Sequence, residues 1–325
     1  MTHRPITHGP LAQLPASLQR RRLIQGVAAA IALPAVSTWA QAPRVLRVGN
    51  QKGALTLIKG RGTLEKRLAP LGVSVTWTEF NAGPVQLEAL NVGAIDFGDV
   101  GEAPPIFAQA AGAPLAYVAA TVPRPSAEAV LVHKDSPIKT VADLKGRKVA
   151  LNKGSNVHYF IVKLIEQAGL KYADLNFVFL SPPDARAAFE KGSVDAWVIW
   201  DPFLAAAEQT LGARILADGT GVVGNRGYYF SSLNYVAKNQ DVLSLVIEEI
   251  NKLDQWAVAN KSAYAGELAT LWGLPKSVVD VSVGRAAYGT SPITKAILAE
   301  QQKIADTFFA LKLIPRAIQV SEASA

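Results

Sequence analysis

Five junctions between predicted strands and helices carry small and polar residues that could bind an anion. They lie at residues 51–53, 81–84, 99–102, 153–156 and 200–202, and most of them contain glycine or proline. Such junctions expose backbone N–H groups that have no partner within the helix, together with the positive end of the helix dipole. In an open α/β sheet they gather beyond the carboxyl ends of the strands. Each junction alone is more typical of an ordinary loop, but together they predict a cleft for an anionic or polar ligand.

The candidate ligand-binding residues at these junctions are mainly hydrogen-bond donors. We expect backbone N–H groups and uncharged polar side chains to face the ligand, at Gln51, Gly83, Gly101, Ser155, Asn156 and Tyr228, with Pro84 as a further contact beside Gly83. Pro84 suits the first turn of a helix, where a missing N–H costs nothing. Ser155 suits the N-cap of the helix that follows it. Lys52 could attract an anion, or it could equally be solvated.

Four further candidates each carry a structural interpretation beside the functional one. Trp200 ends a predicted strand and could contact the carbon chain of a ligand, whereas Trp197 faces the opposite side of that strand. A cationic His158 would oppose the dipole of its helix, so we expect a neutral, hydrogen-bonding role. Asp201 and Glu102 would repel an anion if their carboxylates faced it. Asp201 is also placed to cap the next helix.

The elements that must position these residues alternate between strand and helix. Strand-like runs lie at 45–49, 73–77, 95–98, 115–121, 129–133, 148–151, 177–180, 194–200 and 228–236, with helical spacing between most of them. The part after residue 241 is typical of helix. This alternation predicts an α/β fold with mostly parallel sheets in two lobes. We expect lobe 1 at 43–133, lobe 2 at 134–229, and a return to lobe 1 with C-terminal helices at 230–325.

The composition excludes several classes of protein. The chain has no cysteine, which excludes disulfides, thiolate metal sites, cysteine nucleophiles and a lipid anchor on cysteine. The formal net charge is +7, but residues 1–42 hold four arginines and no acidic residue, so the remainder is only mildly basic. Without a basic stripe interleaved with aromatic residues, we expect no nucleic-acid partner. His133 and His158 are too few for a histidine metal cluster and no Walker-type loop is present, so we expect no metal, cofactor or catalytic residue.

Residues 1–42 are typical of an export signal peptide. Arginines at 20–22 precede an apolar stretch at 26–33 that is too short to span a bilayer with ease. Small residues follow, and we expect cleavage after Ala40 or Ala42, which leaves a mature protein in the periplasm. The arginine pair and the apolar pair after it are similar to a twin-arginine signal, and an ordinary secretion signal is the alternative.

Longer motifs identify a family. Residues 192–202 read Gly-Ser-Val-Asp-Ala-Trp-Val-Ile-Trp-Asp-Pro, and further motifs lie at 49–53, 80–84, 87–96, 104–112, 136–146 and 184–189. Together they resemble the periplasmic aliphatic-sulfonate-binding proteins of the sulfonate, nitrate and taurine importer class, over most of residues 45–235. The resemblance implies a two-lobed periplasmic binding protein of the class II type, with the ligand cleft between hinged lobes. It also implies an organic sulfonate as ligand, and the membrane permease and ATPase of an ABC importer as partners. We expect a monomer.

Two alternatives stay open at this point. Within the same class the ligand could be taurine, nitrate or a thiamine-precursor pyrimidine. Taurine would need a carboxylate for its ammonium group, which Asp201 or Glu102 could supply. The other alternative is an enzyme on the same two-lobed fold, because a fold does not determine a function. The lack of cysteine and the scarcity of histidine favour a binding protein.

Overall fold

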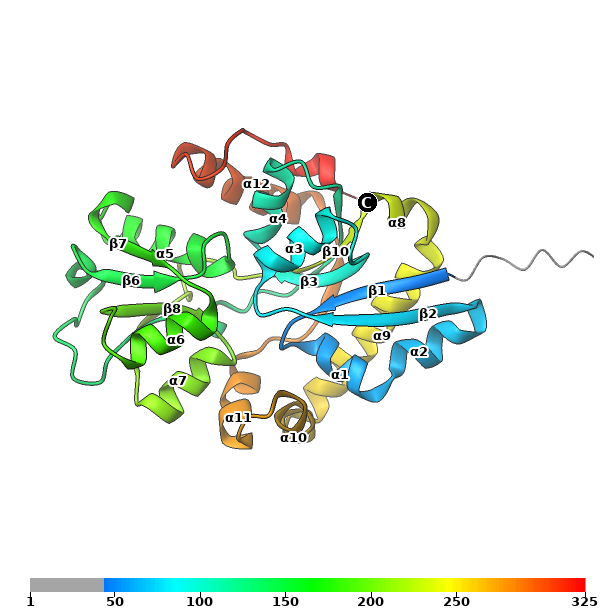
Figure 1. Cartoon of the computed structure of the whole chain (residues 1–325), viewed down its shortest axis with the longest axis horizontal. Helices are drawn as coiled ribbons and strands as arrows, with labels where there is room; N and C mark the ends of the chain where they lie inside the picture. Colours follow the sequence, from blue (N-terminus) through cyan, green and yellow to red (C-terminus); the bar gives the residue numbers. More distant parts are fainter. Residues whose placement is uncertain (1–43, 325) are drawn as a thin grey trace, which may run out of the picture. The chain divides into compact units, whose positions relative to one another are not determined.

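The computed structural model describes residues 44–324, which are organised around two β-sheets (Figure 1). The export signal predicted at residues 1–42 lies outside the described residues. In the described part of the chain, no helix combines the length and the apolar character that crossing a membrane requires.

Six strands form the first sheet. They are β1 (Arg44–Asn50), β2 (Val73–Glu79), β3 (Phe97–Gly101), β4 (Leu115–Thr121), β10 (Gly227–Ser232) and β11 (Thr290–Pro292). Their order is β11-β4-β10-β3-β1-β2. The strand β1 runs parallel to β2 and β3, whereas β10 is antiparallel to both of its neighbours. The strand β10 is thus the return strand that the chain inserts after visiting the other sheet.

Five strands form the second sheet. They are β5 (Glu128–Val132), β6 (Lys148–Leu151), β7 (Asn176–Phe179), β8 (Ala196–Trp200) and β9 (Arg214–Asp218). Their order is β7-β6-β8-β5-β9. The strands β6, β7 and β8 are parallel, and β5 is antiparallel to β8 and β9. Each sheet is therefore mainly parallel with an antiparallel strand where the chain crosses.

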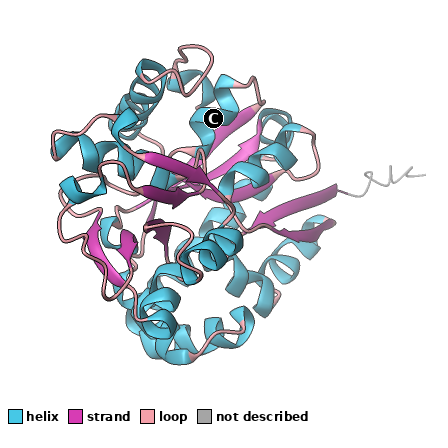
Figure 2. Ribbon diagram, turned by 60° about the vertical axis from the view of Figure 1, so that its left-hand side comes forward, coloured by secondary structure: helices cyan, strands magenta, loops and turns pink. Residues whose placement is uncertain are grey.

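Helices cover both faces of each sheet (Figure 2). Those associated with the first sheet are α1 (Ala54–Arg61), α2 (Thr63–Leu68), α3 (Gly83–Asn91), α4 (Pro104–Ala110), α8 (Leu233–Lys238), α9 (Gln240–Ala259), α10 (Lys261–Trp272) and α12 (Lys295–Ala310). Those of the second are α5 (Asn156–Gln167), α6 (Pro182–Glu190) and α7 (Phe203–Leu211). The helix α11 (Lys276–Arg285) packs on α7 through Val278, Ala205 and Ala206.

The spacing of apolar residues explains how the helices attach to the sheets. In α9, Val242, Val246, Ile250 and Leu253 are buried, and they recur every three or four positions on one face. They share an apolar cluster with residues of α1, α2 and β1, while α3, α4 and α12 pack in a second cluster of the same sheet. The second sheet likewise has one cluster with α5 and another with α6 and α7. Burial of these faces fixes the strand ends, where the candidate site lies.

The chain passes between the sheets at residues 122–127 and again at 219–226. The strand β5 pairs with β8 and β9, so it lies in the second sheet, although the sequence suggested a boundary at residue 133. The strand β10 starts at Gly227, slightly before the suggested boundary at 229. The reason is that a short apolar run such as β5 is buried on both faces in either sheet, so its pattern does not reveal its partners.

Candidate ligand-binding site

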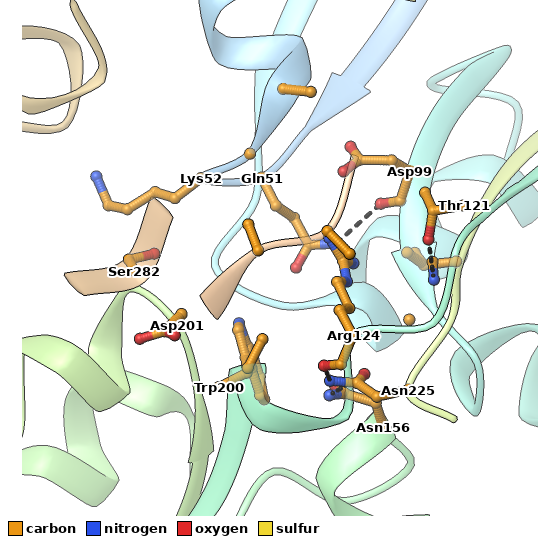
Figure 3. Close-up of a pocket in the computed structure, with 18 of the residues that line it drawn as sticks. Gln51, Lys52, Asp99, Thr121, Arg124, Asn156, Trp200, Asp201, Asn225 and Ser282 are labelled. Atoms are coloured by element: carbon orange, nitrogen blue, oxygen red, sulfur yellow. Dashed lines mark hydrogen bonds between the residues drawn. The ribbon is translucent and has the colours of Figure 1, made fainter. Parts of the chain in front are cut away.

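A cavity of about 160 Å³ lies where strand ends of both sheets meet (Figure 3). The first sheet supplies the ends of β3 and β4, and the second supplies the end of β8 and the start of α5. The loop after β1, the helix α10 and residues 282–289 complete the wall. This is the edge at which an α/β sheet usually binds a ligand, because the helix starts converge there.

Most of the predicted site residues line this cavity. They are Gln51, Gly83, Gly101, Ser155, Asn156, Trp200, Asp201 and Tyr228. Lys52 lines it too, and its Nζ donates to the carbonyl oxygen of Trp272 at 3.3 Å. Pro84, Glu102 and His158 are not among the lining residues.

The end of β1 is tied to the end of β3 by Gln51. Its side-chain Nε2 donates to the backbone carbonyl oxygen of Asp99 at 2.9 Å (Figure 3). The backbone carbonyl oxygen of Gln51 accepts from Thr56 Oγ1 at 2.8 Å. An amide nitrogen carries two donors, so one N–H of Gln51 is left for a ligand.

Gly101 lets the two sheets approach closely. A Cβ atom at this position would lie 2.9 Å from Cβ of Asn156, at the start of α5, which is closer than real carbon contacts allow. Any larger residue would push α5 away from the end of β3. Gly101 thus acts through its lack of a side chain, which places the donors of α5 beside the first sheet.

The start of α5 carries two predicted residues with different roles. Ser155 occupies the N-cap position, but its side chain accepts no hydrogen bond from the helix, and its Oγ donates to the carbonyl oxygen of Asn152 at 2.7 Å. The first N–H groups of α5 are therefore not capped by this side chain. Asn156 Nδ2 donates to Glu128 Oε2 at 2.5 Å and to Asn225 Oδ1 at 3.2 Å, so this amide joins β5 to the second crossing.

Arg124 is a lining residue that the sequence analysis missed. It lies in the first crossing, and its carbonyl oxygen accepts from Asn225 Nδ2 at 3.1 Å. Its guanidinium lies near Gly227, and it neither donates a hydrogen bond nor forms an ion pair within residues 44–324. A guanidinium has five donors and keeps its charge at all ordinary pH values. Arg124 is thus a strong candidate to receive an anion.

Two aromatic side chains lie on the cavity wall as predicted. Trp200 is half-buried at the end of β8, and its ring meets that of Phe203 edge-on, with centroids 6.2 Å apart. Tyr228 is almost fully buried, and its ring packs edge-on against Tyr117 at 5.2 Å. Burial raises the pKa of the Tyr228 hydroxyl, and the nearby Tyr117 adds to the rise, so this group stays a neutral donor.

His158 faces an aromatic pocket of its own rather than the cavity. The backbone N–H of Gly154 donates to its Nδ1 at 3.2 Å, and its Nε2 lies 2.8 Å from the hydroxyl of Tyr172. The ring packs near Phe107 and Phe308. Burial, with a smaller effect of Lys153, lowers the pKa of His158 to about 4. His158 thus has the expected neutral, hydrogen-bonded role, but its helix turn points the ring into the core and outside the lining of the cavity.

The other two predicted residues outside the lining are held by the protein itself. Pro84 is in the first turn of α3, half-buried, where it shapes the helix start. Glu102 is buried, and its Oε2 accepts from the backbone N–H of Arg226 at 3.1 Å. Burial raises the pKa of Glu102 to about 7. Its carboxyl thus belongs to the second crossing, behind the cavity wall.

Three aspartates lie in the cavity wall. Asp201 Oδ1 accepts from the backbone N–H of Ala205 at 3.0 Å, as expected for a cap of α7, and lies 3.5 Å from Arg285 Nη1. Burial raises the pKa of Asp201 to about 6, and it does the same for Asp99. Burial also raises the pKa of Asp254. These groups make the cavity more than a simple anion site.

Most lining residues that were not predicted come from strand ends, crossings and late helices. Besides Arg124, they include Thr121, Asn225, Asp254, Tyr264, Leu268, Trp272 and Tyr288, while Asp99 lies within the junction at 99–102 but was not among the candidates. Arg124 did carry a signal, because it stands between two prolines in the link between two predicted strands. The residues of α9 and α10 carried none, because their helices have no junction motif.

Known proteins similar to this chain include aliphatic sulfonate-binding proteins. The family model described as NMT1/THI5 like matches residues 70–263. The aliphatic sulfonates-binding protein of Escherichia coli (strain K12) is 42% identical over 297 residues, which are 89% of this chain and 92% of that protein. Its crystal structure superimposes with a TM-score of 0.79, covering 87% of this chain and 98% of that one.

A second solved structure agrees. The alkanesulfonate-binding protein of Xanthomonas axonopodis pv. citri bound to MOPS is 40% identical, with a TM-score of 0.83, and covers 88% of this chain and 99% of that chain. These matches span both sheets and the cavity between their strand ends. The chain therefore belongs to the NMT1/THI5-like family, among its aliphatic sulfonate-binding proteins.

Proposed function

We propose that this chain is the extracytoplasmic substrate-binding component of an ABC importer and captures aliphatic sulfonates. The observation that carries the proposal is the guanidinium of Arg124, which has no partner within residues 44–324 and borders a cavity walled by helix starts. A sulfonate is fully ionised near neutral pH and has no proton to donate, so its oxygens need only donors. Arg124, the second N–H of Gln51 and the uncapped N–H groups of α5 supply them.

The apolar part of the wall fits the rest of such a ligand. Trp200 on one side and Leu268 with Trp272 on the other offer surface to a short carbon chain. Each methylene that they bury contributes about 0.8 kcal/mol. The relative from Xanthomonas axonopodis pv. citri was solved with MOPS, which is a propanesulfonate carrying a morpholine ring. This supports a ligand with a sulfonate head on a short carbon chain.

We propose further that the two sheets act as hinged lobes around the crossings at 122–127 and 219–226. A ligand that contacts both lobes favours the closed state, because only that state makes all the contacts. In this role the chain is exported, its signal at residues 1–42 is removed, and it works as a monomer that delivers ligand to a membrane permease and its ATPase. It binds without turnover.

Calorimetry with a panel of ligands tests this function. We expect propanesulfonate to bind and nitrate and a thiamine-precursor pyrimidine to give no heat. Recovery of the sulfonate unchanged after long incubation checks that the protein does not convert it. Binding of nitrate or the pyrimidine in place of any sulfonate would contradict the proposal, as would release of sulfite.

A further inference from the structure

The charges in the cavity wall do not match a purely anionic ligand. The lining holds three aspartates, Asp99, Asp201 and Asp254, against only two cations, Lys52 and Arg124. Asp201 has a counter-charge in Arg285 at 3.5 Å. Neither Asp99 nor Asp254 has an ion pair within residues 44–324. Two uncompensated carboxylates would weaken the binding of any anion, so their presence needs a reason.

Asp99 is the less satisfied of the two. It lies in the middle of β3 on the cavity wall, and its Oδ1 is buried without a hydrogen-bond partner among the described residues. Its Oδ2 lies beside Gly53, where a Cβ atom would be 3.4 Å away. A buried carboxylate oxygen without a donor costs free energy, and a ligand that donates to it removes that cost.

Asp254 lies with Asp99 beside a group of tyrosines. Its Oδ2 accepts from Thr290 Oγ1 at 2.8 Å, and it is 9% exposed. Burial raises the pKa of Tyr264, and the neighbouring Tyr288 and the charges of Asp254 and Asp99 add to the rise. The rings of Tyr264 and Tyr288 meet edge-on at 5.5 Å, and both line the cavity. Carboxylates beside aromatic rings are the surroundings in which proteins bind ammonium groups.

Arg124 separates this corner from the helix start of α5. In Figure 3 Asp99 lies at one edge of the cavity, Asn156 and Asn225 at the other, and Arg124 between them. The positive charge of Arg124 opposes the effect of burial on the pKa of Asp99 and of Asp254, but it forms no ion pair with either. Along this line the cavity therefore offers an acceptor at Asp99 and donors at Arg124 and the start of α5.

We propose that the preferred ligand is a zwitterionic sulfonate, whose sulfonate is held by Arg124 and the start of α5 and whose ammonium is held by Asp99 and Asp254. This inference rests on the proposed function and names the class of sulfonate. It also assigns ligand specificity to two residues, Asp99 in β3 and Asp254 in α9. Burial raises the pKa of Asp99 to about 6, and an ammonium beside it would lower that value.

The test compares three ligands with the same carbon chain by calorimetry at neutral pH. They are propanesulfonate, homotaurine, which is propanesulfonate with a terminal ammonium, and N-acetylhomotaurine, which keeps an N–H but has no positive charge. A charge-assisted hydrogen bond in a partly buried site corresponds to about tenfold or more in affinity. We expect the wild type to bind homotaurine at least about tenfold more tightly than either neutral-tailed ligand.

Variants then assign the effect to the two carboxyls. Asp99→Asn and Asp254→Asn should each reduce the preference for homotaurine, and the double variant should abolish it, while propanesulfonate binds at least as well as before. Retained binding of propanesulfonate also shows that each variant is folded. Asp135→Asn is the matched control, because Asp135 is exposed and outside the cavity lining, and it should keep the full preference.

The outcomes separate this inference from the proposed function. If propanesulfonate binds and homotaurine binds no better, the zwitterion inference is wrong and the proposed function stands. Equal binding of homotaurine and its acetyl derivative would also overturn the inference, because the charge would then not be recognised. A preference that survives in the double variant would place the ammonium elsewhere. If none of the three binds, the proposed function itself fails.

Discussion

The side-chain amide of Asn156 donates to Oδ1 of Asn225 at 3.2 Å, and so joins the first turn of α5 to the second crossing between the sheets. The same nitrogen donates to Glu128, the first residue after the first crossing. One side chain of the cavity wall thus contacts the second crossing and the residue that directly follows the first.

Replacing Asn156 by Ala should destabilise the protein. The change leaves the buried carboxyl of Glu128 without its donor, which costs about 1–3 kcal/mol of the free energy of unfolding. Urea unfolding measures the loss. Asn176→Ala is the control, because the Asn176 amide donates to Gly146 on the exposed surface, and a change there should stay within about 0.5 kcal/mol. Equal losses in the two variants would mean that the Asn156 bridge has no special role.

Replacing Arg124 by Gln should weaken the binding of every sulfonate. The loss of a charged donor at an anion corresponds to about 1.5–3 kcal/mol, or roughly tenfold to more than a hundredfold in affinity. Arg124→Lys keeps the charge but not the paired donors, so its affinity should lie between those of the wild type and Arg124→Gln. Calorimetry with propanesulfonate measures both. Arg186→Gln on α6, far from the lining residues, should bind as the wild type does. Unchanged affinity in Arg124→Gln would remove Arg124 from the site.

Replacing the two tryptophans of β8 should affect different properties, stability for Trp197 and ligand affinity for Trp200. Trp197 is fully buried in a cluster with Phe189, so Trp197→Ala should lower the free energy of unfolding by about 3–5 kcal/mol. Trp200 lines the cavity, so Trp200→Ala should weaken long-chain sulfonates more than short ones, by about 0.8 kcal/mol for each methylene it buries. Calorimetry over an alkanesulfonate series shows the trend. A loss in Trp200→Ala that is independent of chain length would place the carbon chain elsewhere.

The pH dependence of stability should change in Glu102→Gln. Burial raises the pKa of Glu102 from 4.5 to about 7, so between these values the folded chain holds a proton that the unfolded chain has released. The contribution of this group to stability therefore declines as the pH rises through that window. We expect the wild type to lose stability relative to Glu102→Gln between pH 4.5 and about 7. Urea unfolding across this range checks it, with the exposed Glu88→Gln as control. Parallel curves for the wild type and Glu102→Gln would contradict the assignment.

Much of the fold followed from local patterns in the sequence. The strands β1 to β8 lie close to the apolar runs that predicted them, whereas β9 was not predicted. Junction motifs located the cavity because helix starts gather at one edge of each sheet. The pattern after residue 241 predicted only helix, but the structure has a short strand there, β11 at Thr290–Pro292. Three residues that pair with β4 at a sheet edge leave too little periodicity to detect.

The unpredicted part of the site depends on tertiary contacts. Asp254 and Tyr264 reach the cavity because α9 and α10 fold back on the first sheet, and a helix pattern shows which face is buried but not what lies beside it. His158 shows the reverse case. It stands one turn from Ser155 in the sequence, yet its ring packs among Phe107 and Phe308 and takes no part in the lining. A position near a junction predicts proximity to the cavity, not the direction of the side chain.

The most direct test of the central claim compares propanesulfonate with propyl phosphate, its phosphate twin, by calorimetry on the mature protein at neutral pH. The donors around Arg124 suit oxygens that carry no proton, whereas a monoanionic phosphate needs an acceptor for its proton and a dianion adds charge near Asp99 and Asp201. We predict that propanesulfonate binds at least about tenfold more tightly than propyl phosphate, and more tightly than sulfate. Propyl phosphate bound as tightly as propanesulfonate, or more tightly, would contradict a cavity built for sulfonates.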